Sequence, residues 1–175
     1  MGLFDKIKQT ASIWMPDENQ IKYEKGKSFE QYVIDLFDKN YFVIEDWTRD
    51  NSNKLDGRIV ESDMNPDLLI RSKNANQRFA VECKWRANPI RSEKLNALVV
   101  SWSRQEQISR YRKYSYTRKI PVYVVIGLGG EPNHPNNMFC LPLNTAKYPE
   151  MYYSVIKKYE RPNNKPFIWK DGLLQ

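Results

Sequence analysis

The sequence predicts an α/β domain in which a central mixed sheet is flanked by helices. The patterns follow the order helix, three strands, helix, strand along the 175-residue chain. The last of these strands, residues 120–127, is a near-continuous apolar run, typical of a strand buried on both faces. A right-handed crossover through the second helix would place it parallel to the third strand. The length suits one domain.

The first helix is predicted from an apolar stripe, and Ser28 fits its N-cap. The stripe falls at i, i+4, i+7 and i+8: Phe29, Val33, Leu36 and Phe37. Residues 1–25 are expected to be an N-terminal extension with a short amphipathic helix, and Pro16-Asp17 is a helix-start or turn signal. Residues 41–47 resemble a strand, and a polar connection through 51–57 follows.

The next two strands form a predicted hairpin. An apolar strand at residues 68–70 follows Pro66-Asp67, a polar loop covers residues 72–77, and residues 79–85 form the second strand. Side chains alternate along a strand, so Glu82 and Lys84 point one way while Val81, Cys83 and Trp85 point toward a core. Asp67, Glu82 and Lys84 are therefore expected to share one surface.

The remaining elements are expected from local pattern. Residues 89–100 are expected to form a loop or short helix, residues 104–116 the second helix, and residues 138–143 a further strand. Residues 150–160 predict a C-terminal helix, followed by a proline-broken tail at 162–175. The expected core spans residues 26–145, with the C-terminal helix and tail, 146–175, packed on the same domain.

A lysine buried between carboxylates is costly unless the protein uses it, and a divalent cation held by the acids beside the lysine is such a use. Pro66-Asp67 followed by Glu82-Cys83-Lys84 resembles the PD-(D/E)xK nuclease superfamily. That resemblance implies a restriction-endonuclease-like αβββαβ core. It also implies hydrolysis of DNA phosphodiesters with Mg²⁺ or Mn²⁺ as cofactor. The alternative for the isolated motif is a surface hairpin with an ordinary salt bridge.

The resemblance also assigns roles to residues. The metal ligands would be Asp67, Glu82 and the backbone carbonyl of Cys83, while Lys84 would orient the nucleophile or stabilise the transition state. In Holliday-junction-resolvase-like and Mrr-like branches the first helix adds an acid, which Glu30 matches. The alternative for Glu30 is a favourable interaction with the helix dipole.

Gln107 and Tyr111 lie four residues apart, on one face of the second helix. They resemble the Gln-x-x-x-Tyr element of RecB-like nucleases. This resemblance implies that Gln107 acts in the catalytic site and that Tyr111 contacts nucleic acid, or that the pair positions substrate or a catalytic group. The alternative is an ordinary, partly buried helix face.

The formal net charge is +7. Basic residues gather in the second helix beside aromatic residues, and Lys and Arg neutralise phosphates. The predicted nucleic-acid contacts there, besides Tyr111, are Arg104, Arg110, Arg112 and Lys113. The alternative is a solvated helix face.

His134 is the only histidine, so a nuclease built on paired histidines is excluded. Cys83 and Cys140 lack zinc-ligand spacing, and Cys83 is expected to be a small core residue. With no signal-peptide or transmembrane pattern, the expected location is the cytoplasm, without a membrane partner. No ATP-binding motif is present, so no nucleotide cofactor is expected.

The expected partner is DNA, and a homodimer would allow two sites to cut two strands. The expected function is an endonuclease in DNA repair, recombination or defence against foreign DNA. The alternatives are a catalytically silent nucleic-acid-binding module, an RNA-directed nuclease and a protein-interaction domain. The sequence leaves open sequence-specific, structure-specific or exonucleolytic cutting.

Overall fold

A computed structural model describes residues 17–48 and 65–175 of the chain. The predicted polar connection through 51–57 and the apolar residues of the expected N-terminal amphipathic helix lie outside the described residues. The principal sheet has six strands in the order β1-β2-β3-β6-β7-β9. Their bounds are β1 Phe42–Trp47, β2 Leu68–Ser72, β3 Gln77–Arg86, β6 Val122–Leu128, β7 Asn137–Pro142 and β9 Glu160–Arg161.

The sheet is mixed. β1, β2 and β3 form an antiparallel meander, and β6 then lies parallel to β3, with Ala80 opposite Val122 and Arg86 opposite Leu128. β7 returns antiparallel to β6. The predicted hairpin, the buried parallel strand and the further strand are therefore confirmed.

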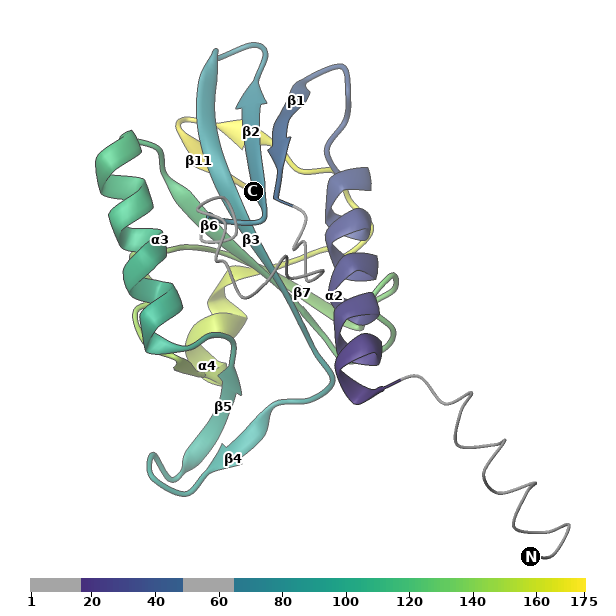
Figure 1. Cartoon of the computed structure of the whole chain (residues 1–175), viewed down its shortest axis with the longest axis vertical. Coiled ribbons are helices and arrows are strands. Elements are labelled where there is room, and N and C mark those ends of the chain that lie inside the picture. The colour runs from purple at the N-terminus through teal and green to yellow at the C-terminus, as the bar shows by residue number, and fades with distance from the viewer. Residues whose placement is uncertain (1–16, 49–64) are drawn as a thin grey trace, which may run out of the picture.

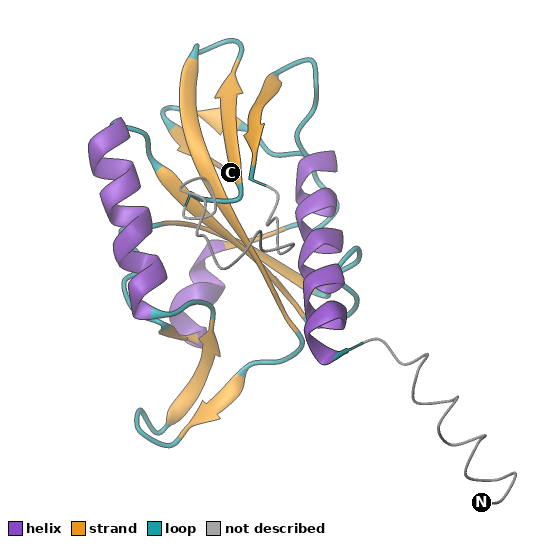
Figure 2. Ribbon diagram, viewed as in Figure 1, coloured by secondary structure: helices purple, strands orange, loops and turns teal. Residues whose placement is uncertain are grey.

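Two helices cover opposite faces of this sheet, as Figures 1 and 2 show. α2 (Glu18–Asp35) buries Phe29 and Val33 against residues of β2 and β3 such as Leu68 and Val81. α3 (Gln105–Arg118) packs on the other face, where Ile108 joins the apolar residues of β6. Alternate residues of β3 therefore enter two different cores.

α2 begins earlier than its apolar stripe indicates. Its first residue, Glu18, directly follows Pro16-Asp17, so the helix-start signal there is confirmed. Ser28 is an interior residue of α2, and the prediction of Ser28 as N-cap is wrong. The first turns of α2 are largely exposed, so they carry no apolar periodicity. The expected domain boundary between residues 25 and 26 lies inside this helix.

A second, three-stranded sheet replaces two expected elements. β4 (Ile90–Ser92) and β5 (Ala97–Ser101) form a hairpin where a loop or short helix was expected, and Asn96 in its turn has a φ of 44°. β5 also pairs with β8 (Glu150–Tyr152).

The predicted helix over residues 150–160 is helical only over residues 153–159, and both of its ends are strands. That segment contains β8, a single turn α4 (Tyr153–Ile156), a 3₁₀ turn η2 (Lys157–Tyr159) and β9. Its two ends pair with β5 and β7, and these long-range hydrogen bonds override the local periodicity.

The last residues form the short hairpin β10 (Trp169–Lys170) and β11 (Leu173–Leu174). Phe167 stacks on Phe37, and Trp169 stacks on Phe79, both with ring centroids 4.5 Å apart. The tail therefore completes the core beneath α2. In the described ranges, no helix is both long and apolar enough to cross a membrane.

Candidate active site

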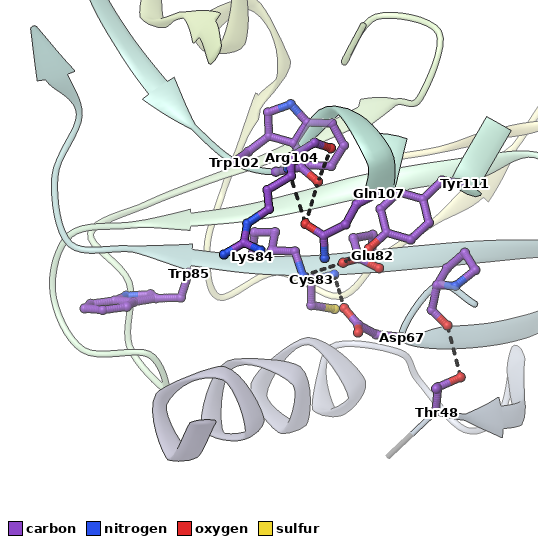
Figure 3. A network of polar contacts seen from close by, with 12 residues as sticks. Thr48, Asp67, Glu82, Cys83, Lys84, Trp85, Trp102, Arg104, Gln107 and Tyr111 are labelled. Carbon is purple, nitrogen blue, oxygen red and sulfur yellow. Dashed lines mark hydrogen bonds and ion pairs between the residues drawn. The ribbon is translucent and has the colours of Figure 1, made fainter. Parts of the chain in front are cut away.

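Glu82 and Lys84 lie on the face of β3 that α3 covers, where Figure 3 shows them beside Tyr111. Glu82 is only 1% exposed. Its Oε1 accepts a 2.5 Å hydrogen bond from the Tyr111 hydroxyl and forms an ion pair with the Lys84 ammonium. One carboxylate oxygen is thus fixed by two donors from two elements.

Asp67 joins this pair from the neighbouring strand. It precedes Leu68, which lies opposite Val81, and its Oδ2 accepts a 2.7 Å hydrogen bond from the Cys83 backbone N–H. Burial and the nearby Glu82 carboxylate raise the pKa of Asp67 well above its usual range. The hairpin therefore brings together the acids and the ammonium that the sequence placed on one surface.

The Lys84 ammonium lies beside two acids, and its side chain is 21% exposed. Burial alone would lower the pKa of Lys84, but the Glu82 and Asp67 carboxylates outweigh that effect and raise it above the usual value. Lys84 lines the cleft, whereas Asp67 and Glu82 are not among its lining residues.

Glu30 reaches the same cleft from α2. Its Oε2 accepts a 3.0 Å hydrogen bond from the Trp47 indole N–H, and burial raises its pKa. Glu30 lies in the C-terminal half of α2, so the alternative of a favourable N-terminal dipole interaction is wrong. The neighbouring Phe29 packs directly over Gly127, which holds α2 close to the sheet.

Gln107 lines the cleft, and its side chain also caps the N-terminus of α3. Its Oε1 accepts hydrogen bonds from the Ser103 hydroxyl at 3.2 Å and from the Arg104 backbone N–H at 3.3 Å. Tyr111 is 4% exposed, so the predicted contact of its phenol with nucleic acid is wrong for this arrangement. Its hydroxyl instead positions Glu82.

The cleft has a volume of about 640 Å³, and its lining includes five cationic side chains and one carboxylate, that of Glu30. Lys25 lies over the Trp85 ring, 5.3 Å from its centroid. Arg86 donates to the carbonyls of Ser101 and Trp102 at 2.6 and 2.7 Å, which ties the cleft to β5. The cationic lining residues are Lys22, Lys25, Lys84, Arg86 and Arg104.

Sequence reasoning missed Lys22 and Lys25 as lining residues. Their spacing of three places both on one side of a helix. That signal was available only if α2 was expected to begin near Asp17 rather than at Ser28.

The four basic residues predicted to contact nucleic acid lie in different environments. Arg104 lines the cleft. Arg112 is exposed and donates to the Lys147 carbonyl at 3.0 Å, and Lys113 is exposed. Arg110 is half-buried, and its Nε has no hydrogen-bond partner among the described residues. Only Arg104 of the four borders the cleft.

The donor set fits a hard divalent cation. Glu82 Oε2 is buried and has no hydrogen-bond partner among the described residues. Within residues 17–48 and 65–175, no group of three or more His, Cys, Asp or Glu side chains is close enough to hold an ion alone. Mg²⁺ commonly takes only one or two protein carboxylates and keeps several waters. Asp67 and Glu82 match that pattern.

No protein-family model matches this chain, and no curated protein matches it. Among solved structures, it is similar to Hjc, a Holliday junction resolvase from the archaeal hyperthermophile Archaeoglobus fulgidus. The sequences are 16% identical, the TM-score is 0.50, and the match covers 76% of this chain and 93% of that chain. The chain has a restriction-endonuclease-like fold. The predicted fold class is confirmed.

Proposed function

We propose that this protein is a metal-dependent deoxyribonuclease that hydrolyses DNA phosphodiester bonds. The observation that carries the proposal is the convergence of Asp67, Glu82 and Lys84 beside a cationic cleft, with Glu30 at its wall. A fold shared with a Holliday junction resolvase supports it. Endonucleolytic cutting in repair, recombination or defence is the corresponding biological role.

Asp67, Glu82 and the Cys83 carbonyl would hold Mg²⁺ or Mn²⁺, and Glu30 would hold ion-bound water. When bound, the ion supplies Lewis acidity to the phosphodiester and lowers the pKa of a coordinated water. Tyr111 fixes Glu82 Oε1, which would leave Oε2, unpartnered within residues 17–48 and 65–175, as the donor for the cation.

Lys84 is the group that acts on the phosphate. Its ammonium is paired with Glu82 and lines the cleft, and the Glu82 and Asp67 carboxylates raise its pKa in spite of burial. It would stabilise the additional negative charge that develops on the phosphate oxygens and orient the attacking water. Lys22, Lys25 and Arg104 would neutralise neighbouring phosphates along the cleft walls.

The test is cleavage of linear, circular, branched and single-stranded DNA, and of RNA, with Mg²⁺, Mn²⁺ or a chelator. Asp67→Asn, Glu82→Gln and Lys84→Met should each abolish metal-dependent cleavage and retain the circular dichroism spectrum of the wild type. The matched controls are Glu160→Gln and Lys157→Met, which change the same residue types far from the cleft and should cleave normally.

The alternatives predict different results. Cleavage retained by the three cleft variants would refute the assignment of the site. Salt-sensitive binding without turnover on any substrate would identify a silent nucleic-acid-binding module. Turnover of RNA alone would identify an RNA-directed nuclease.

A further inference from the structure

A second cationic pocket lies at the opposite end of α3 from the cleft. It has a volume of about 770 Å³ and is lined by residues from β1, β2, β3, the end of α3 and the C-terminal tail. Its charged residues are Arg71, Arg78, Arg118, Lys119 and Glu45. We call it the distal pocket.

Glu45 holds two of these cations in place. Its carboxylate accepts hydrogen bonds from Arg71 Nε at 2.8 Å and from Arg78 at 2.7 and 3.3 Å. The Arg71 and Arg78 side chains remain 32% and 58% exposed. One carboxylate thus orients two guanidinium groups without neutralising the four cations of the distal pocket. Oriented guanidinium groups suit the planar oxygens of a phosphate.

Arg78 of the distal pocket lies on the same face of β3 as Glu82 and Lys84 of the candidate site. Every second residue of β3 points to the same face, which holds Arg78, Ala80, Glu82 and Lys84. Ala80 belongs to the core beneath α3. α3 begins beside the cleft at Arg104 and ends beside the distal pocket at Arg118. Lys119, with a φ of 54°, caps this C-terminus, where the helix dipole favours cations.

The lengths of β3 and of α3 give two independent values for the distance between the cleft and the distal pocket. At about 3.3 Å per residue, β3 spans about 20 Å from Arg78 to Lys84. At about 1.5 Å per residue, α3 spans about 21 Å from Arg104 to Arg118. One strand of DNA places a phosphate every ~3.4 Å along the helix axis, so about six phosphates cover this distance.

We propose that the distal pocket binds the sugar–phosphate backbone of the nucleic acid cut in the cleft, about six base pairs from the scissile phosphate. This inference rests on the proposed function and extends it to the substrate. The protein then acts on a duplex arm long enough to reach both sites.

The test compares two triple variants that remove the same formal charge. The distal variant is Arg78→Gln, Arg118→Ala and Lys119→Gly, in which glycine keeps the left-handed backbone of position 119. The control variant is Arg91→Gln, Lys157→Ala and Lys158→Ala, which changes exposed cations that line neither pocket. Binding to labelled duplexes is measured by fluorescence anisotropy in chelator, where no turnover occurs.

The wild type and the control variant should bind a duplex of about 18 base pairs far more tightly than a hairpin whose stem has about four, which cannot span both sites. The distal variant should lose most of this gain. Each phosphate contact contributes about 0.9 to the slope of log affinity against log salt concentration. Between about 50 and 200 mM KCl, the affinity of the wild type should therefore fall by a factor about 40-fold larger than that of the distal variant, which lacks three contacts.

Equal losses in the distal and control variants would overturn the inference, because net charge alone would then explain binding. If the wild type cuts DNA and this equality is found, only the inference fails. Pocket-dependent binding without turnover on any substrate would support the inference and refute the nuclease proposal. Absence of binding by the wild type to either DNA would overturn the inference, whereas the nuclease proposal is decided by the cleavage assay.

Discussion

At the scale of single residues, Glu82 combines almost complete burial with an incomplete set of partners. One oxygen is held by Tyr111 and Lys84, while the other has no partner among the described residues. An unsatisfied buried acceptor costs about 1–3 kcal/mol, and more when it is charged. Such a cost is typical of a site arranged for a ligand rather than for stability.

Tyr111→Phe removes the hydrogen bond to Glu82 Oε1 and little volume. We expect cleavage to fall about 10- to 100-fold, because groups that orient ligating carboxylates have effects of this size. The matched control is Tyr32→Phe, which removes a 2.6 Å hydrogen bond to the Asn163 carbonyl far from the cleft. Steady-state cleavage assays check both, and an equal loss in the two variants would contradict a positioning role for Tyr111.

Asp67→Asn should stabilise the metal-free protein. The folded state raises the pKa of Asp67, so its ionisation destabilises folding as pH rises above the unfolded value of about 3.9. We expect the variant to match the wild type in acid and to exceed it by roughly 1–3 kcal/mol at neutral pH. Urea unfolding in chelator across this pH range measures the difference. A difference in the free energy of unfolding that is the same at every pH would contradict ionisation of Asp67 as its cause.

Glu45→Gln should show the opposite pH dependence and serves as the counterpart. Hydrogen bonds from Arg78 and Arg71 lower the pKa of Glu45, so its stabilisation is present above the unfolded value of about 4.3 and is lost as pH falls through the folded value. The variant should be less stable than the wild type by about 1 kcal/mol at neutral pH, with the difference closing in acid. The same unfolding series measures it.

At the scale of elements, the position of α2 depends on Gly127 of β6. A Cβ built on Gly127 would lie 2.4 Å from the Phe29 ring, which is fully buried. Gly127→Ala should therefore displace α2 and cost about 1–3 kcal/mol. It should also weaken cleavage, because Glu30 follows Phe29 on the same helix. Thermal unfolding and cleavage assays check the two effects.

Gly26→Ala is the matched control for the close approach at Gly127. Gly26 lies within α2, and a Cβ there would meet no atom within 4 Å. The substitution should stabilise the protein by roughly 0.5–1 kcal/mol, because alanine has a higher helix propensity than glycine. Destabilisation by both substitutions would show that α2, not its contact with Gly127, is sensitive to change.

At the scale of the whole molecule, the C-terminal tail completes the core beneath α2. Phe167 is 2% exposed and stacks on Phe37, and its backbone N–H donates a hydrogen bond to the Leu36 carbonyl. Phe167→Ala should cost about 3–5 kcal/mol. The neighbouring Ile168 is 60% exposed, and Ile168→Ala should change stability by less than about 0.5 kcal/mol. Chemical denaturation measures both, and equal effects would contradict the role of the tail.

Local sequence pattern was sufficient to predict a strand, and the direction of its side chains, where consecutive residues alternate or form an apolar run. The alternation of β3 predicted Glu82 and Lys84 on one face, and the apolar run at 122–126 predicted the strand that pairs with β3. Local pattern was insufficient where distant strands compete with helix periodicity. Residues 150–152 became β8 because β5 offered an edge, and no local signal reports that edge.

The sequence by itself determined the αβββαβ order and the choice of Asp67, Glu82 and Lys84, because strand alternation and hairpin pairing act over few residues. Tertiary structure decided how these groups are used. Burial on the inner face of α3 raised the pKa of Tyr111 and placed its phenol on Glu82 rather than on the surface. It also left Glu82 Oε2 without a hydrogen-bond partner in the part of the chain that the structure describes. Desolvation and unpaired atoms depend on what packs above a strand, which its own residues do not specify.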